Sequence, residues 1–418
     1  MSEPIVERNI APLAREIIAE SPITVISGAR QVGKSTLMRQ LVAHENAQIV
    51  NLDATINRNA AQSDPDAFVR QYPEGTLAID EIQRVPELLL AMKNALETDR
   101  RPGRFIVTGS SNLLTLQGTE ESLAGRAQTL ELRGFSRGEL MGRSEDFASF
   151  AWKLPQTGAV HNLNDYSRRD YLEMATHSSY PELQGKTDRT RNRWLSAYVE
   201  RIISKDVPEA VGIQHPDRLR PLLQLLATES ASEFVAARYS RALDIPARTV
   251  PAYLQALVNV YLVDRLPAWS NNVAARTVSK PKTFLQDPGL AAFLSGVDIE
   301  GLEQQISSTL TGGLVEAFVA GELQRQRGWS EVDFTLRHFR DSQGREVDLV
   351  LENRARQIVG LEVKATTSVT RSHFKGLEYL RDKAGDRFIA GAVLHTGTQA
   401  LPFGDHLWAL PIATLWQH

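Results

Sequence analysis

The chain has 418 residues, with 47 Lys and Arg against 50 Asp and Glu, no Cys and a formal net charge of -3. This length predicts two or three domains, and the lack of Cys excludes a disulfide scaffold, an iron–sulfur cluster and a thiolate zinc site. The first ten residues lack the apolar stretch of a secretory signal, and no apolar run reaches the roughly 20 residues of a membrane span. We therefore expect a cytoplasmic protein without a membrane segment.

Three regions differ in their pattern along the chain. Residues 1–145 alternate short apolar runs with helical stretches, which predicts βα units and a mostly parallel sheet. The predicted strands lie at 23–27, 48–52, 76–80, 105–108 and 129–132. Residues 165–298 are mainly helical in pattern, and residues 311–418 predict the order helix, three strands, helix, strand. Gly, Pro, Asn and Ser collect near 141–164, 267–282 and 295–312, where we expect linkers or loops.

A phosphate-binding loop is predicted directly after the first strand. The segment GARQVGKS at residues 28–35 matches G-x-x-x-x-G-K-[ST] and precedes a helical pattern. Glycines let backbone N–H groups turn toward phosphates, and the helix N-terminus adds its dipole. Lys34 is expected to reach the β- and γ-phosphates, and the Ser35 hydroxyl to bind Mg²⁺. The predicted nucleotide-binding residues are Gly28, Ala29, Arg30, Gln31, Val32, Gly33, Lys34, Ser35 and Thr36.

Two later strands end in polar side chains that suit the same site. The strand TLAID is followed by a second acid, so that Asp80 would hold Mg²⁺ and Glu81 would polarise the attacking water. The strand at 105–108 ends in Thr108, which with Ser110 is a candidate sensor of the γ-phosphate, because parallel strands present their C-terminal ends to the ligand. The alternatives are a solvated acidic turn in the first case and ordinary turn chemistry in the second.

Arg126 follows Gly125 at the end of a predicted helical turn. A single surface Arg is usually solvated, but an Arg beside Gly at the end of an element can also reach a neighbouring subunit's phosphates as an arginine finger.

Four segments together carry a family resemblance: RQVGKS at 30–35, AIDEIQ at 78–83, TGSS at 108–111 and SLAGR at 122–126. They resemble the prokaryotic AAA-type ATPases with a C-terminal domain of unknown function, family 4143. The tail matches as well, so the resemblance covers nearly the whole chain. It implies an oligomer, often a ring, in which Arg126 acts across the subunit interface.

The middle region predicts a winged helix. Helices are expected at 219–228, at 233–243 with Ser232 as its cap, and at 247–259, followed by wing strands at 261–266 and 283–285. One face of the third helix offers Arg248, Thr249, Gln255 and Asn259 to DNA. The alternative is a packing or oligomerisation module, since only one of these four residues is charged.

The tail predicts a second charged site. Residues two apart on a strand share a face, so Glu362 pairs with Lys364, and Asp348 joins them if the two strands are neighbours. Two carboxylates then form a hard-oxygen Mg²⁺ site, and Lys364 positions a water or stabilises phosphate charge. The pattern resembles the PD-(D/E)xK restriction-endonuclease-like core, in which Glu316 matches the additional acid. The alternative is a cross-strand salt bridge on a solvated sheet face.

The sequence thus predicts an α/β protein with an N-terminal AAA-type P-loop sheet, a helical winged-helix middle and a restriction-endonuclease-like α/β tail. The expected domains span 1–145, 165–298 and 311–418. We expect Mg²⁺-dependent ATP binding and hydrolysis by an oligomer that acts on DNA, with cleavage by the tail left open. The alternative is a nucleotide-gated regulatory module that binds a protein partner and carries a catalytically inactive tail.

Overall fold

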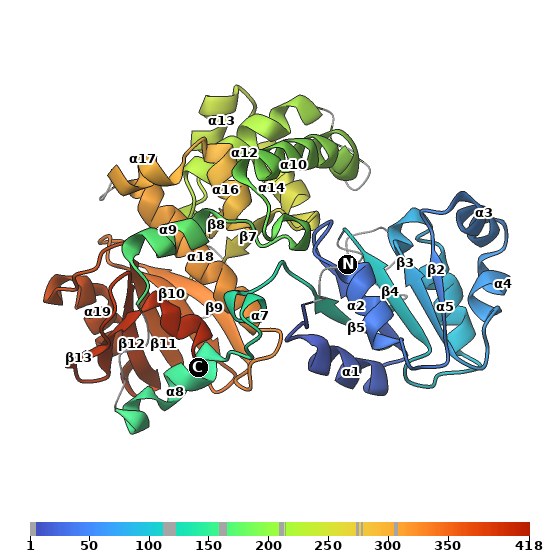
Figure 1. The fold of residues 1–418 in the computed structure, drawn as a ribbon, viewed down its shortest axis with the longest axis horizontal. Coiled ribbons are helices and arrows are strands. Elements are labelled where there is room, and N and C mark those ends of the chain that lie inside the picture. The colour runs from blue at the N-terminus through green and yellow to red at the C-terminus, as the bar shows by residue number, and fades with distance from the viewer. Residues whose placement is uncertain are drawn as a thin grey trace.

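The computed structural model describes residues 6–111, 123–158, 165–208, 213, 215–272, 276, 279–304 and 308–418. Ser122 of the SLAGR segment lies outside these ranges. An N-terminal, a middle and a C-terminal module follow one another, with the middle module above the other two in Figure 1. Of the helices within the described ranges, none has the length and apolar character that a bilayer crossing requires.

The N-terminal module is a five-stranded parallel sheet with strand order β2-β3-β4-β1-β5. Its elements are α1 (Ala11–Glu20), β1 (Ile23–Ser27), α2 (Lys34–Leu41), β2 (Ala47–Asn51), α3 (Thr55–Ser63), α4 (Pro65–Arg70), β3 (Thr76–Asp80), α5 (Leu88–Leu96), β4 (Phe105–Gly109) and β5 (Ala127–Glu131). Each of the five predicted strands is present, shifted by two residues at most, and the expected α/β class is confirmed.

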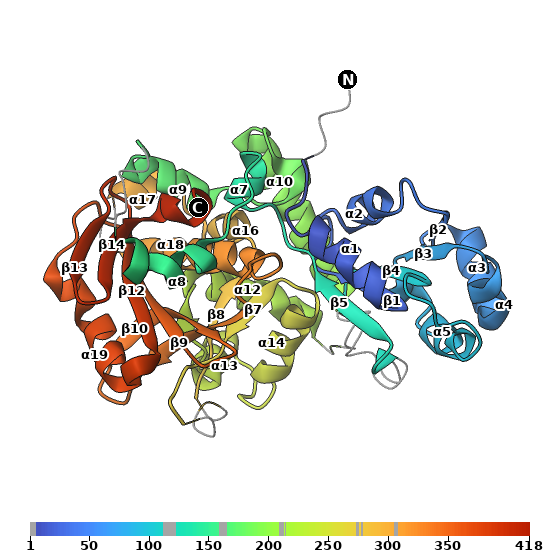
Figure 2. The same cartoon turned by 90° about the horizontal axis from the view of Figure 1, so that it is seen from below.

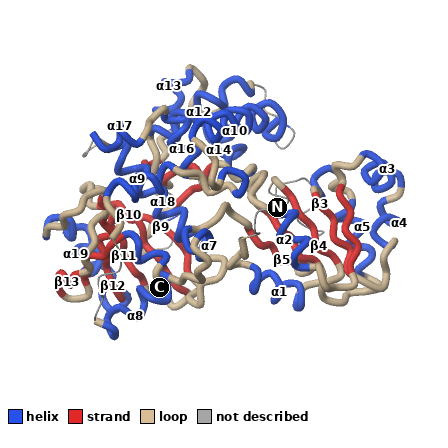
Figure 3. The backbone as a smooth tube through the Cα atoms, in the orientation of Figure 1, coloured by secondary structure: helices blue, strands red, loops and turns tan. Residues whose placement is uncertain are grey.

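Largely apolar runs form the three central strands β3, β4 and β1, because helices cover both faces of the sheet (Figure 3). Every side chain of β1 and β4 is buried. Alternate residues enter different cores: Ile26 and Ile106 pack on one side, and Val25 and Val107 on the other. Because all five strands are parallel, their C-terminal ends meet at one edge of the sheet.

The middle module combines helices with a small antiparallel sheet of order β6-β8-β7. Its elements are α9 (Arg168–Thr176), α10 (Asp188–Arg201), α12 (Leu219–Thr228), β6 (Ser232–Glu233), α13 (Ala236–Leu243), α14 (Val250–Asn259), β7 (Val263–Leu266), β8 (Lys282–Leu285), α16 (Pro288–Ser295) and α17 (Ile299–Gln304). The sequence predicts Ser232 to be a helix cap, and this prediction is wrong. Ser232 is a strand residue that pairs with Thr283. The left-handed backbone of Ala231 (φ 60°) turns the chain into this strand.

The C-terminal module is built on a six-stranded mixed sheet of order β13-β14-β12-β11-β10-β9. Its elements are α18 (Thr309–Gln326), β9 (Phe334–Arg340), β10 (Glu346–Asn353), β11 (Ile358–Lys364), α19 (Lys375–Ala384), β12 (Phe388–His395), β13 (Leu401–Gly404) and β14 (Leu407–Pro411). The predicted order of helix, three strands, helix and strand is present. Strands β13 and β14 extend the sheet beyond that expectation.

Part of the expected linker at 141–164 is a helix that belongs to the C-terminal module. Helix α8 (Phe147–Thr157) is capped by Asp146, whose carboxylate accepts from the Ser149 N–H. Its buried side chains recur at helical spacing, and the helix packs on β12. A second short helix, α7 (Arg137–Leu140), precedes it.

Charged side chains join the N-terminal module to the rest of the chain along its β5 edge. In both views this edge faces the other modules, and β2 lies toward the far end (Figure 2). Arg133, just after β5, binds Asp264 of β7 with N–O distances of 2.6 and 3.1 Å. Arg8 binds Glu139 of α7 at 2.9 Å. Both arginines are largely buried, so these pairs are part of the packed interior.

Candidate functional site

The predicted phosphate loop connects β1 to α2. Gly28 (φ 142°), Gln31 (φ 66°) and Gly33 (φ 98°) have positive φ angles, which give the loop its sharp turns. A Cβ at Gly28 would lie 2.0 Å from the carbonyl oxygen of Leu132, so only glycine fits there. Helix α2 begins at Lys34, directly after Gly33, and its N-terminus favours an anion at this end of the loop.

Lys34 is folded back onto the loop. Its ammonium donates to the carbonyl oxygens of Gly28 and Ala29 at 3.0 and 2.7 Å. Burial lowers the pKa of Lys34 to about 8, against the opposing effect of Glu81 and Asp80. The two carbonyl contacts hold the side chain within the loop that the motif assigns to phosphate.

Asp80 is the centre of a hydrogen-bond network at the C-terminal edge of the sheet. Its buried carboxylate accepts from the Ser35 hydroxyl at 2.9 Å, the Thr108 hydroxyl at 2.5 Å and the Asn51 amide at 3.1 Å. Three strands and the loop therefore contribute to one cluster. Ser35 and Asp80 place a hydroxyl and a carboxylate side by side, which is a donor set of hard oxygens that suits Mg²⁺.

Glu81 follows Asp80 in a left-handed conformation (φ 62°). Its N–H donates to the Thr108 hydroxyl at 3.1 Å, and its carboxylate accepts from the Gln83 amide. The same amide donates to Ser110 at 2.9 Å. Gln83 thus connects the candidate base with the end of β4.

Arg30 of the phosphate loop reaches the middle module. Its guanidinium donates to Asp206 at 2.8 and 3.4 Å, and Asp206 ends the π-helical turn (Ile202–Asp206) that follows α10. The Tyr198 hydroxyl of α10 also donates to the Arg30 carbonyl at 3.3 Å. A side chain within the nucleotide motif is therefore held by the neighbouring module.

Arg126 lies at the end of the sheet where the strands begin, whereas the phosphate loop lies at the end where they finish. Arg126 directly precedes β5, whose N-terminal residue Ala127 pairs with Ile23 at the start of β1. Its guanidinium is 3.4 Å from a Glu97 carboxylate of the same chain. Within one chain the geometry keeps Arg126 away from the phosphate loop.

The structure brings the predicted residues of the tail together. Asp348 of β10 accepts from the Val363 N–H of β11 at 2.9 Å, and Lys364 lies 2.6 Å from Glu362. Glu316 of α18 faces the same cluster. Asp348 and Glu362 are 5% and 7% exposed, so the cluster is buried rather than part of a solvated sheet face.

An unpredicted residue, Lys282 of β8, occupies this acidic cluster. Its ammonium is 2.6 Å from Glu316 and 3.2 Å from Asp348. Burial, reinforced by the charge of Asp348, raises the pKa of Glu316 and of Glu362 to about 8. Burial acts the same way on Asp348, but Lys282 and Lys364 outweigh it and hold the pKa of Asp348 below its usual value. In the described part of the chain, no three His, Asp or Glu side chains are arranged to hold a metal ion.

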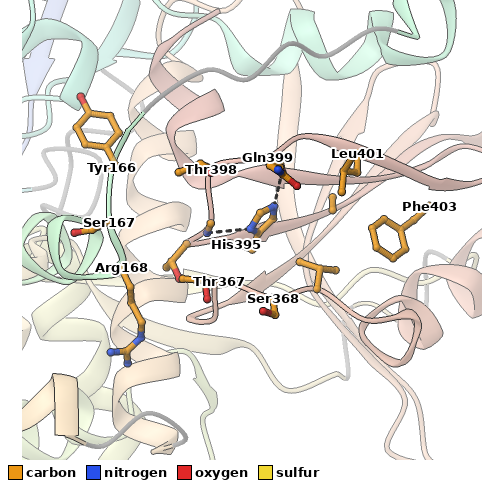
Figure 4. Close-up of a pocket in the computed structure, with 14 residues that line it drawn as sticks. Tyr166, Ser167, Arg168, Thr367, Ser368, His395, Thr398, Gln399, Leu401 and Phe403 are labelled. Carbon is orange, nitrogen blue, oxygen red and sulfur yellow. Dashed lines mark hydrogen bonds between the residues drawn. The ribbon is translucent and has the colours of Figure 1, made fainter.

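A cavity of about 510 Å³ lies beyond the ends of β11 and β12 (Figure 4). Hydroxyl-bearing side chains such as Ser167, Thr367 and Thr398 line it together with Arg168. Burial lowers the pKa of His395, and both ring nitrogens have partners, the Gly397 N–H and the Gln399 carbonyl, each at 3.0 Å. His395 therefore stabilises the loop after β12.

Sequence reasoning missed five residues of these sites: Asn51, Gln83, Arg8, Asp206 and Lys282. Asn51 ends β2 and could have been found, because polar residues at the ends of parallel strands meet at one edge. The Arg8 guanidinium donates to the Val32 carbonyl of the loop at 3.2 Å, from 24 residues away. Asp206 and Lys282 lie on another module, and no local pattern marks them.

Three known domain families match consecutive parts of the chain. The AAA domain matches residues 20–141, a domain of unknown function (DUF8612) matches residues 168–300, and a second one (DUF4143) matches residues 311–415.

Relatives were found among proteins and solved structures. The chain is 26% identical over 411 residues to uncharacterized proteins of Mycobacterium tuberculosis (strain ATCC 25618 / H37Rv) and Mycobacterium bovis, and the match covers 97% of this chain and 84% of each relative. Among structures, it is similar to a Walker-type ATPase of Pyrococcus abyssi (15% identity, TM-score 0.43, 69% of this chain and 96% of that one). It is also similar to AMPPCP-bound DnaA from Aquifex aeolicus (14% identity, TM-score 0.27, 60% and 86%).

Proposed function

The chain carries an N-terminal AAA domain of the P-loop ATPase type and a C-terminal domain of family 4143, and from this premise we propose that it binds and hydrolyses ATP with Mg²⁺. The observation that carries the proposal is the network around Asp80, which unites Ser35, Thr108 and Asn51 beside the phosphate loop. Such a cluster of hard oxygens at the C-terminal edge of a parallel sheet is what a Mg–nucleotide requires.

Each residue has a role in this proposal. The loop 28–36 and the N-terminus of α2 bind the phosphates, and Lys34 moves from the two carbonyl oxygens to the β- and γ-phosphates. Ser35 and Asp80 would hold Mg²⁺, which would neutralise phosphate charge. Glu81 orients and polarises the attacking water, while Thr108 fixes Asp80 and the Glu81 backbone.

We assign the middle module to the winged-helix type. The order helix, strand, two helices and two strands, with β8 between β6 and β7, supports this assignment. Of the four residues expected to face DNA, Arg248 is exposed but precedes α14, which begins at Val250. Asn259, the last residue of α14, is buried and accepts from Gln255 at 2.7 Å. This helix therefore offers DNA fewer groups than the sequence suggested.

The test of hydrolysis uses the Glu81→Gln variant. Gln keeps the size of the side chain but cannot accept a proton, so we expect ATP binding close to that of the wild type and turnover reduced by about 10²- to 10⁴-fold. Binding is measured by calorimetry and turnover by phosphate release, with Glu87→Gln on the same module as the control. Equal turnover of wild type and Glu81→Gln would exclude Glu81 as the base.

A second candidate function is a nucleotide-gated module that binds a protein partner through an inactive tail. Lys282 favours it, because this ammonium occupies the acidic cluster that a nuclease-like tail would use. Binding of labelled duplex and single-stranded DNA, with and without ATP at two salt concentrations, separates the two. ATP-dependent binding that weakens with salt supports action on DNA, and no binding under any condition supports the regulatory module.

A further inference from the structure

The side chain of Lys282, in the middle module, places its buried ammonium among acids of the C-terminal module. Lys282 is the first residue of β8, the central strand of the middle sheet, and its backbone pairs with Glu233 of β6 and Leu266 of β7. The residue is 4% exposed. Because two strands hold its backbone, the position of the ammonium depends on the docking of the middle module against the tail.

The partners of Lys282 are the acids that a divalent cation would need. The ammonium contacts Glu316 on α18 and Asp348 on β10 at 2.6 and 3.2 Å, and the second Asp348 oxygen accepts the Val363 N–H. Both oxygens of Asp348 are thus engaged. One oxygen of Glu362 is bound by Lys364, and the other is buried without a hydrogen-bond partner in the described part of the chain.

An ammonium and a divalent cation compete for this cluster. A buried ammonium is stable only beside carboxylates that compensate its lost hydration. Mg²⁺ needs the same oxygens at roughly 2.1 Å, in near-octahedral geometry. Two cations so close together would repel strongly in a buried site. The residues as arranged therefore do not fit the metal that the nuclease-like pattern implies.

We propose that Lys282 is the resident cation of the Glu316, Asp348 and Glu362 cluster and excludes divalent metal ions from the tail. The middle module supplies the charge that a nuclease-like fold takes from a metal ion. In this arrangement the cluster connects the two modules and is closed to metal-dependent phosphodiester chemistry.

The experiment counts Mn²⁺ ions bound per chain, without nucleotide, by electron paramagnetic resonance. Four proteins are compared with the wild type. They are Lys282→Met, which removes the charge but keeps an unbranched chain; Lys282→Met with Asp348→Asn; Asp348→Asn alone; and Lys280→Met, a nearby exposed control. We expect Lys282→Met to gain one saturable Mn²⁺ site that the added Asp348→Asn change removes. We expect wild type and Lys280→Met to lack it.

Thermal unfolding provides a second measurement. Mn²⁺ should raise the Tm of Lys282→Met, because a bound ion stabilises the folded state, and leave that of the wild type unchanged. A wild-type Mn²⁺ site that Asp348→Asn abolishes would overturn the proposal even if Lys282→Met failed to fold. A folded Lys282→Met protein that gains no site would overturn it as well. None of these measurements depends on ATP hydrolysis.

Discussion

The Thr108 hydroxyl forms hydrogen bonds with both acidic residues of the proposed nucleotide site. It donates to the Asp80 carboxylate and accepts from the Glu81 N–H. We predict that Thr108→Val lowers ATP turnover about 10- to 100-fold, as loss of a supporting hydrogen bond around a metal ligand does. Steady-state phosphate release measures this.

Thr24 provides the matched control for that substitution. It lies on β1 of the same sheet, fully buried, and its hydroxyl has no hydrogen-bond partner among the described residues. Thr24→Val should therefore leave turnover unchanged. If the two variants have the same turnover, the hydroxyl of Thr108 has no role in the site.

Glu145 makes stability depend on pH. It is 1% exposed and accepts from Ser136 and Asn9 at 2.5 and 2.8 Å, and burial raises its pKa to about 8. The unfolded chain releases this proton near pH 4.5, whereas the folded chain keeps it to about pH 8. The contribution of Glu145 to stability is therefore fully present at low pH and is lost as pH rises from about 4.5 to 8.

We predict that Glu145→Gln, which resembles the protonated acid, removes this loss. Its free energy of unfolding should exceed that of the wild type at pH 8 by an amount on the order of 1 to 4 kcal/mol, and match it near pH 5. Urea unfolding at both pH values measures the difference. A constant difference across this range would contradict the assignment.

At the scale of elements, the π-helical turn after α10 and the phosphate loop are connected through Arg30 and Asp206. We predict that single Ala substitutions at either residue weaken ATP binding and that the double variant is no weaker than the worse single one. A double-mutant cycle by calorimetry should give a coupling on the order of 0.5–3 kcal/mol. The exposed pair Arg220 and Glu200 serves as the control, with an expected coupling near zero. Additive effects at Arg30 and Asp206 would mean that the ion pair does not reach the nucleotide.

Elements with strong apolar patterns could be predicted from the sequence. Very short elements, and contacts that depend on distant parts of the chain, could not. Strands β1, β3 and β4 are runs of mostly buried residues, and the sequence locates all five strands within two residues. Strand β6 has only two residues and forms because β8, far along the chain, pairs with it. Helix α8 has the right periodicity, but neighbouring Gly and Asn suggested a loop. The contacts of Asp206 and Lys282 could not be predicted, because they depend on how modules dock.

At the scale of the whole molecule, we propose that Arg126 acts on a neighbouring copy of the chain. This residue lies at the sheet edge opposite its own phosphate loop, so an arginine-finger role requires a second subunit. We predict that Arg126→Ala and Lys34→Ala are each inactive alone and that their mixture regains turnover, since one mixed interface is intact. Phosphate release by the mixture measures this. Wild-type turnover in Arg126→Ala alone would exclude the role.

The most direct test of the account is the rate of ATP hydrolysis by the Lys34→Ala variant of the full chain. Lys34 is buried inside the phosphate loop and makes its contacts there, so its loss should abolish hydrolysis. Lys93→Ala, on α5 of the same module, should keep the wild-type rate. Full ATPase activity in Lys34→Ala, measured beside this control, would contradict the claim that the loop at 28–36 is the site of hydrolysis.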